Sequence, residues 1–407
     1  MSEPKQETER KADASRCPLC GQANECALLS GERIEACWCF RASIPSELLQ
    51  RIPDSRRGKS CVCPSCVEEH KRQESVAAEQ SANAADRFIQ LWNHVESVRQ
   101  AIGASAAAVI VMQDGRIAYE RYAGTHPDGR PTDARSRFNV GSVRKSYLGL
   151  VVAWALHDGL LGSVDDPLIR YMPLPYDADI LQDTTIRHLL THTHGLDRQG
   201  RAFASGSSWA YNNQGVNLLI ELTGRLYRKP FVHILKERLF GPGGFTATGW
   251  ETEKSEELIG LDESYPDREG RSANLFVNAR ELALWGMLHA EGGVFRGLPL
   301  VPADVVRLAT AAATPAGLDD AWPRNGFFWQ VQTSQPCERA ELGDKLPAGS
   351  FRILGITGCA VLVIPEQRTV AVRMYNQTIP NPTGYSYLED IRAFGNLVYT
   401  ASAVTRS

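Results

Sequence analysis

Ser142 and Lys145 are the residues whose types and spacing point most directly to chemistry. They lie in Phe138-Asn-Val-Gly-Ser142-Val-Arg-Lys145, where a short apolar segment gives way to a long helix predicted over 142–158. A spacing of i, i+3 places both side chains on one face of a helix. A serine hydroxyl is a weak nucleophile at neutral pH, and a neighbouring amine could accept its proton. The pair therefore indicates a nucleophilic serine.

The spacing alone has little specificity. Ser2-Glu-Pro-Lys5 repeats it in a polar amino-terminal stretch that offers no site. A serine at the start of a helix is usually a capping residue, because its oxygen accepts a hydrogen bond from a free backbone N–H. The elements around Ser142 must therefore decide between the two interpretations.

Length and composition favour a soluble globular protein with more than one domain. The chain has 407 residues, of which 43% are hydrophobic and 22% charged, with a formal net charge of -3. This balance suggests neither a nucleic-acid partner nor a membrane surface, and no run of about 18 apolar residues predicts a membrane span. Residues 1–16 are polar and lack the apolar core of a secretory signal, so we expect a disordered tail and a cytoplasmic location.

All but two of the ten cysteines lie before residue 70 and define a separate module over 17–70. The candidate metal ligands are Cys17, Cys20, Cys26, Cys37, Cys39, Cys61, Cys63 and Cys66. Two-residue spacing lets a pair of thiolates bind one tetrahedral ion, so eight thiolates could hold about two zinc ions. Metal binding would then supply folding free energy that so small a core lacks.

A disulfide framework would need the same cysteines, but it is disfavoured in the reducing compartment that the missing export signal implies. Around Cys17-Pro-Leu-Cys20 and Ala36-Cys-Trp-Cys39 the module resembles the small cysteine-rich family named for its Cys-Trp-Cys tripeptide. Basic and acidic residues balance in residues 1–75, which argues against nucleic acid. A structural role or a protein partner is the expected function of the module.

After the module, a polar segment over 71–85 reads as a linker, and an amphipathic helix follows over 85–102. Residues 107–122 form two β-rich runs about Asp114-Gly115, which is a strong signal for a hairpin. A further helix is predicted from Thr185 to His192. These elements frame the segment that contains Ser142.

Several segments of the chain, in order over roughly 87–400, resemble the serine β-lactamase, penicillin-binding protein and carboxylesterase superfamily in its class C-like branch. The segments are the hairpin, Phe138 to Lys145, Leu189-Leu-Thr-His-Thr-His-Gly-Leu196, Trp209-Ala-Tyr-Asn-Asn-Gln-Gly215, Ser272 to Leu282 and Thr357 to Glu366. The resemblance implies an α/β fold over 86–402, in which a mainly antiparallel sheet is formed by both ends of the domain and flanked by helices. A helical subdomain would be inserted between them.

The resemblance also implies roles for individual residues. Ser142 would be the nucleophile, Lys145 its base and Tyr211 a proton relay to the leaving group, while Asn213 would point at the substrate or at Lys145. To act as a base at neutral pH, Lys145 needs a lowered pKa. The alternating histidines of Thr191-His-Thr-His194 belong to the family pattern, and without a nearby carboxylate we expect neither to be catalytic.

The third motif of the family departs from its usual sequence. Where relatives carry Lys-Thr-Gly or His-x-Gly, this chain has Ile353-Leu354-Gly355, or in a second register Ile356-Thr357-Gly358. The positive side chain is missing in both registers. The backbone N–H of Ile356, which follows Gly355, could still join that of Ser142 as an oxyanion hole.

The missing cation and the expected cytoplasmic location disfavour substrates that are held by a carboxylate, such as β-lactams and D-Ala-D-Ala peptides. We therefore predict hydrolysis of a small ester or amide through an acyl-serine, with no catalytic cofactor, similar to the esterase and 6-aminohexanoate-oligomer hydrolase subset. Two alternatives remain. One is a β-lactamase or peptidase, and the other is a non-catalytic scaffold recruited to a protein by the zinc module.

Overall fold

The computed structural model describes residues 13–172, 181–197, 200–259, 261, 274–377 and 379–403, apart from the side chains of 74–85. It divides into two compact units, Met1–Ala84 and Ala85–Ser407. Residues 71–85, expected as a linker, lie within helix α3 (Pro64–Arg87). Most of the tail expected over 1–16 lies outside the described residues.

The first unit consists of short elements around a small core. Its elements before α3 are η1 (Ala27–Ser30), η2 (Ile34–Ala36), α1 (Trp38–Arg41), α2 (Ser46–Gln50) and η3 (Asp54–Arg56). The buried hydrophobic residues that pack together are Cys17, Leu48, Ile52, Val62, Cys63 and Val67. So few residues bury too little apolar surface to stabilise a fold without help.

The second unit is built on a six-stranded antiparallel sheet, in the order β11-β12-β13-β14-β1-β2. The strands are β1 (Ala106–Gln113), β2 (Arg116–Gly124), β11 (Gln330–Val331), β12 (Phe351–Leu354), β13 (Ala360–Ile364) and β14 (Thr369–Tyr375). The first strand of the unit pairs with its last, from Ala107 opposite Tyr375 to Gln113 opposite Thr369. Both ends of the unit therefore form the sheet, as predicted.

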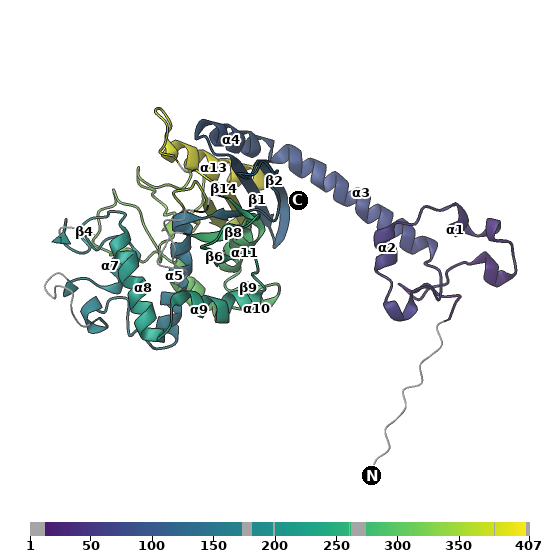
Figure 1. Cartoon of the computed structure of the whole chain (residues 1–407), viewed down its shortest axis with the longest axis horizontal. Helices are drawn as coiled ribbons and strands as arrows, with labels where there is room; N and C mark the ends of the chain where they lie inside the picture. The colour runs from purple at the N-terminus through teal and green to yellow at the C-terminus, as the bar shows by residue number, and fades with distance from the viewer. Residues whose placement is uncertain are drawn as a thin grey trace, which may run out of the picture. The chain divides into compact units, whose positions relative to one another are not determined.

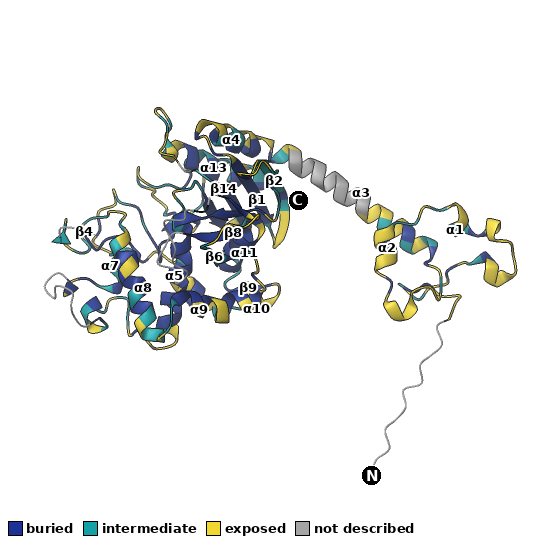
Figure 2. Ribbon diagram, viewed as in Figure 1, coloured by how far each residue is buried: buried dark blue, intermediate teal, exposed yellow. Residues whose placement is uncertain are grey.

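Helices cover both faces of this sheet (Figure 1). One face packs against α4 (Ile89–Ala101) and α13 (Tyr387–Ser402), and the other against α11 (Ala279–Ala290). Side chains of β1 alternate between the two faces of the sheet. Val109 packs toward α4 and α13, and Ile110 packs toward α11. Burial on both sides explains why β1 is a continuous apolar run and why Figure 2 shows it dark blue.

The helical part of the unit surrounds α5 (Arg144–His157), most of whose residues are buried. The helices that pack against α5 are α8 (Asn213–Tyr227), α9 (Phe231–Leu235) and α12 (Ala303–Thr310), and α7 (Ile186–Leu190) packs against α8. A four-stranded sheet of β6 (Gly249–Trp250), β8 (Leu275–Asn278), β3 (Arg137–Asn139) and β7 (Leu258–Ile259) lies alongside. The remaining elements are η5 (Leu168–Arg170), β4 (Leu196–Asp197), β5 (Gly200–Arg201), η6 (Lys236–Phe240), α10 (Gly241–Gly243), β9 (Val294–Phe295), β10 (Leu298–Pro299) and η7 (Pro365–Gln367).

The predicted hairpin is confirmed, with Asp114 and Gly115 at positive φ in the turn between β1 and β2. The helix predicted over 142–158 is α5, preceded by a 3-10 turn, η4 (Gly141–Val143). The helix predicted from Thr185 is α7, and Thr185 caps it by accepting a hydrogen bond from the His188 N–H. No described helix is both long enough and apolar enough to cross a membrane.

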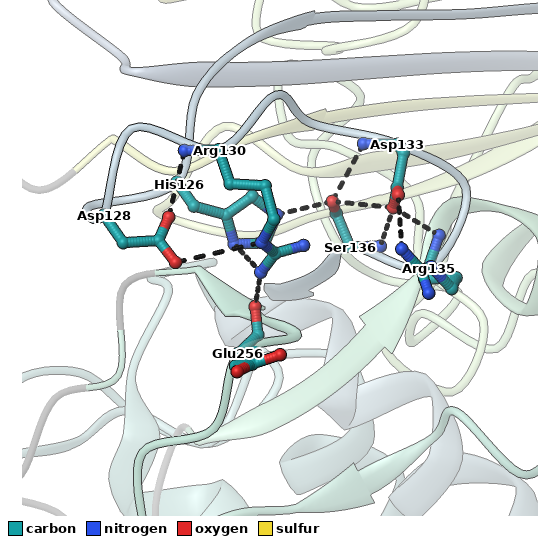
Figure 3. A network of polar contacts seen from close by, with 7 residues as sticks. All are labelled: His126, Asp128, Arg130, Asp133, Arg135, Ser136 and Glu256. Carbon is teal, nitrogen blue, oxygen red and sulfur yellow. Dashed lines mark hydrogen bonds and ion pairs between the residues drawn. The ribbon is translucent and has the colours of Figure 1, made fainter.

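The loop between β2 and β3 is held by the polar network of Figure 3. The Nε2 atom of His126 lies 2.6 Å from the Oγ atom of Ser136, which also accepts a hydrogen bond from the Asp133 N–H. Arg130 donates to the backbone oxygen of Glu256. His126 and Ser136 are only 3% and 1% exposed, so this Ser-His pair is structural and fixes the start of β3.

Candidate active site

Ser142 lies at the junction between strand β3 and helix α5. The Val140 N–H donates to the Leu275 oxygen of β8, which ties the end of β3 to the small sheet. Gly141 then adopts a φ of +51°, in the left-handed region that glycine enters at little cost. Its N–H donates to the Asn139 side chain. This sharp turn places Ser142 immediately before α5.

The structure brings together the three side chains that the sequence singled out for catalysis. The Ser142 Oγ atom lies 2.6 Å from the Tyr211 Oη atom and 3.2 Å from the Lys145 Nζ atom. The Lys145 amine also contacts the Tyr211 hydroxyl and lies 3.8 Å from the centre of its ring. A serine hydroxyl, an amine and a phenol therefore form one hydrogen-bonded group.

Burial sets the protonation of this group. Lys145 is only 2% exposed, and burial together with the neighbouring Arg144 guanidinium lowers its pKa to about 6. At pH 7 the amine is therefore mainly neutral and can accept a proton. Although 52% of Tyr211 is exposed, its hydroxyl faces Lys145, and burial raises its pKa above the ordinary value. The phenol therefore keeps its proton at neutral pH.

His192 packs beside this group and was not expected there from the sequence. Its ring centre lies 4.9 Å from that of Tyr211, 5.5 Å from that of Phe328 and 6.1 Å from that of Trp209. Burial and the nearby Lys145 hold its pKa well below the ordinary value, so the ring is neutral. A histidine between two threonines gave no sign of this contact, because the contact depends on how the loop before α8 folds back.

Strand β12 ends against the Ser142 turn. A Cβ atom on Gly355 would lie 2.1 Å from the Val140 oxygen and 3.4 Å from the Ser142 nitrogen, while one on Gly141 would lie 3.4 Å from the Ile356 nitrogen. Among the hydrogen bonds between described residues, neither the Ser142 N–H nor the Ile356 N–H is a donor. Two free backbone donors thus lie on facing segments beside the Ser142 hydroxyl.

The second register of the third motif has a different environment. A Cβ atom on Gly358 would lie 2.7 Å from the Tyr375 ring, in the turn between β12 and β13. Gly355, and not Gly358, therefore lies against the Ser142 turn. Ile353 is buried, whereas Ile356, whose backbone faces the Ser142 turn, is 85% exposed.

Asn213 is the first residue of α8 and is exposed. Its neighbour Asn212 caps the helix by accepting a hydrogen bond from the Gln214 N–H, and it donates to the Leu196 oxygen. Within the described part of the chain, no hydrogen bond joins Asn213 to Lys145. The role expected for Asn213 stays a prediction.

Four of the eight candidate metal ligands meet in the first unit. The sulfur atoms of Cys17, Cys20, Cys63 and Cys66, which we call the first thiol cluster, all lie within 4.8 Å of one another. Cys17 and Cys66 are 3.8 Å apart, and Cys20 and Cys63 are 3.6 Å apart. Zn–S bonds of about 2.3 Å in a tetrahedron put the sulfur atoms about 3.8 Å apart. The cluster therefore has the dimensions of a site that could hold a metal ion.

Comparison with known families assigns both units. Residues 92–394 match the family described as Beta-lactamase, and residues 17–68 match the family described as Cysteine-rich CWC. An uncharacterized protein of Alkalihalophilus pseudofirmus is 36% identical over 78% of this chain and 97% of its own length. Esterase EstB of Burkholderia gladioli is 30% identical, over 44% of this chain and 45% of the esterase.

Solved structures share the fold. EstCE1, a hydrolase with promiscuous acyltransferase activity, superposes with a TM-score of 0.61 at 17% identity, over 77% of this chain and 99% of its own. The D-alanine carboxypeptidase AmpC of Burkholderia cenocepacia superposes with a TM-score of 0.61 at 18% identity, over 81% of this chain and 100% of its own. The expected class C-like fold is thereby confirmed. The chain belongs to the β-lactamase family of serine hydrolases, which includes β-lactamases, esterases and penicillin-binding proteins, and it carries a Cys-rich CWC module before that domain.

Proposed function

We propose that the protein hydrolyses a small ester or amide through an acyl-serine intermediate, with Ser142 as nucleophile, Lys145 as base and Tyr211 as proton relay. The observation that carries the proposal is the contact of a neutral, buried amine with the hydroxyl of Ser142. A serine attacks a carbonyl only if its proton can leave at the same time. Lys145 offers a lone pair at 3.2 Å for that proton.

Acylation would proceed in two steps. The Ser142 Oγ atom bonds to the substrate carbonyl carbon while its proton passes to the Lys145 Nζ atom, and the carbonyl electrons move to the oxygen. The C–O or C–N bond then breaks, and the leaving group receives a proton through the Tyr211 hydroxyl, which contacts both other groups. Water repeats the sequence on the acyl-serine and releases the acid, which restores Ser142.

The negative oxygen of each intermediate needs hydrogen-bond donors. The free N–H groups of Ser142 and Ile356 lie on the two facing backbone segments and are suited to this task. Donors held by the backbone do not have to reorganise during the reaction. Each one lowers the activation free energy by about 3 kcal/mol. Asn213, exposed at the start of α8, would contact the bound substrate.

The substrate class follows from the third motif. In the register that we prefer, Ile353 takes the position at which the family resemblance implies a lysine or histidine, and its side chain is buried in the core. Ile356 presents an exposed apolar side chain next to Ser142. A site lined in this way favours an uncharged acyl group over a substrate with a carboxylate, which needs a cationic partner.

The proposal is tested with purified full-length protein on p-nitrophenyl acetate and butyrate, linear amides and nitrocefin. We expect wild-type protein to turn over the neutral esters, and a fluorophosphonate to add one label at Ser142. Ser142→Ala should lose both activity and label. The matched control is Ser2→Ala, since Ser2 begins the second Ser-x-x-Lys sequence of the chain.

A Ser142→Ala protein that cleaves these esters at the wild-type rate would rule out the proposed nucleophile. Hydrolysis of nitrocefin in preference to every ester would instead assign the β-lactamase alternative. A folded wild-type protein with neither turnover nor label would leave the ligand-binding scaffold as the better assignment.

For the first unit, we propose a structural role for zinc. Its small core needs further stabilisation, and zinc bound by thiolates contributes directly to folding free energy. Zinc suits four cysteine thiolates in a tetrahedron. The reaction of Ser142 requires no metal.

A further inference from the structure

In the first unit, the four cysteines outside the first thiol cluster are Cys26, Cys37, Cys39 and Cys61. The sulfur atoms of Cys37 and Cys39 lie 3.2 Å apart. The thiols of Cys26 and Cys61 lie near enough to Cys37 and Cys39 to interact with them electrostatically. Each member of this set, which we call the second thiol cluster, therefore lies near at least one other member. Among the described residues, only the first thiol cluster has its sulfur atoms all within 4.8 Å of one another.

Backbone N–H groups point at sulfur atoms in both clusters. The thiol of Cys17 accepts from the N–H groups of Leu19, Cys20 and Cys63. In the second cluster, the thiol of Cys37 accepts from the N–H groups of Ala27 and Cys39. Such donors stabilise a thiolate and orient it toward a metal, in the way that outer partners orient metal ligands in general.

These sulfur atoms are not paired as disulfides. All ten cysteines are free thiols, and the shortest separation of 3.2 Å is well beyond the S–S bond length of about 2.05 Å. Neutral thiols can lie this close, but four sulfur atoms that gather as thiolates need a cation between them, because like charges repel. We propose that the eight cysteines form two separate four-thiolate zinc sites, one at the first thiol cluster and one at the second.

The two sites would be nested along the chain. The residues of the second cluster all fall between the two Cys-x-x-Cys pairs of the first, and Cys61-Val62-Cys63 brings the last ligand of one next to a ligand of the other. An ion at the first cluster would join the two ends of the segment between Cys20 and Cys63. An ion at the second cluster would hold together the residues inside that segment. Closing a loop of this length removes conformational entropy from the unfolded chain.

The clusters also differ in their surroundings. Cys17 and Cys63 belong to the hydrophobic core of the unit, whereas no residue of the second cluster does. Trp38, between Cys37 and Cys39, packs against that core and donates to the Asn24 oxygen. Loss of the second zinc should therefore leave the core and the first zinc in place.

This partition of the eight cysteines between two zinc sites rests on the proposal that the first unit binds zinc, and it is tested separately from that proposal. Full-length wild type, Cys39→Ser, Cys20→Ser and the control Cys337→Ser are purified without chelator, and their zinc is counted by plasma mass spectrometry. Cys337 is half-buried and outside both clusters. We expect about two zinc ions in wild type and control, and one in Cys39→Ser.

Thiol labelling identifies the ligands of the remaining ion. Under native conditions with N-ethylmaleimide, Cys39→Ser should label at Cys26, Cys37 and Cys61 while the first cluster stays protected. Loss of both ions from folded Cys39→Ser, labelling across the two clusters, or two ions retained in Cys20→Ser would overturn the partition. A single zinc in wild type would overturn it while leaving zinc binding intact, and no zinc in wild type would overturn both proposals.

Discussion

The imidazole ring of His192 lies 4.9 Å from the phenol ring of Tyr211, with the two planes inclined by 41°. His192 holds this place in a left-handed backbone conformation, with a φ of +58°, which residues other than glycine adopt only where their surroundings enforce it. Phe328 packs against the same imidazole. The ring thus limits how far the Tyr211 hydroxyl can move from Ser142.

Replacing His192 by alanine should lower kcat for a neutral ester by at least about tenfold and leave KM nearly unchanged, because a relay displaced by about 1 Å transfers its proton poorly. Steady-state kinetics measure both constants. His157→Ala is the control, since His157 is exposed and pairs with Asp304. An unchanged kcat in a folded His192→Ala protein would contradict the positioning role.

The lowered pKa of Lys145 predicts the pH dependence of hydrolysis. In the proposed mechanism the base is the neutral amine, which exists above its pKa, so kcat/KM should rise with pH through about 6 and then level off. Arg144→Met removes a positive charge that contributes to this shift, so the rising limb should move to higher pH. If the rising limb of the pH profile lies at the same pH in Arg144→Met as in wild type, burial alone sets the pKa of Lys145.

Gly355 is predicted to be intolerant of any side chain. In Gly355→Ala the new methyl group would meet the Val140 oxygen, so β12 must move away from the Ser142 turn and separate the two free N–H groups. Loss of one oxyanion donor lowers kcat by about 100-fold or more. Gly317→Ala is the matched control, because nothing lies within 4 Å of a Cβ there and its φ is not positive. Equal activity of the two variants would exclude the proposed oxyanion hole.

Asp390 joins helix α13 to β14 and α4. Its carboxylate lies 2.7 Å from Arg373 and 2.8 Å from His94, and it accepts a hydrogen bond from the Tyr385 hydroxyl. Burial alone would raise the pKa of Asp390, but Arg373, His94 and Tyr385 together lower it to about 2. A lowered carboxyl pKa stabilises the fold above the unfolded value of about 4, and this contribution is lost as pH falls through about 2.

Asp390→Asn leaves Arg373 buried without its charged partner and should lower the free energy of unfolding by about 3 kcal/mol at pH 7. Urea unfolding at pH 7 and pH 3 measures the change, which should be smaller at the lower pH. Asp304→Asn, at an exposed pair, serves as control. A loss of the same size at both pH values would mean that the charge of Asp390 does not contribute.

Local patterns along the chain were enough to predict two elements of the second unit, the hairpin and the helix that follows Ser142. Two β-rich runs about Asp114-Gly115 predicted the hairpin, and helical spacing after Ser142 predicted α5. Each of these signals arises from neighbours a few residues apart, whose geometry is fixed by the strand and helix periods. The ordered motifs then indicated the fold, in which Tyr211 meets Lys145.

Contacts between distant segments could not be predicted in this way. The approach of Gly355 to Val140, the packing of His192 on Tyr211 and the meeting of the four cysteines of the first thiol cluster all depend on how loops return to one place. The spacing of the cysteines was equally consistent with other groupings. Only the folded backbone selects among them, because sulfur atoms must approach within a few ångströms to share one ion.

Pairing of β1 with β14 has a consequence for how the protein becomes active during synthesis. A ribosome releases Ser142 and Lys145 long before β12 and β14 exist, so a nascent chain carries the nucleophile without the Ile356 donor or a complete central sheet. Non-local pairing of this kind forms late in folding. Incomplete chains should therefore be inert, and the proposed hydrolysis should begin only when translation has delivered the last strands of the sheet.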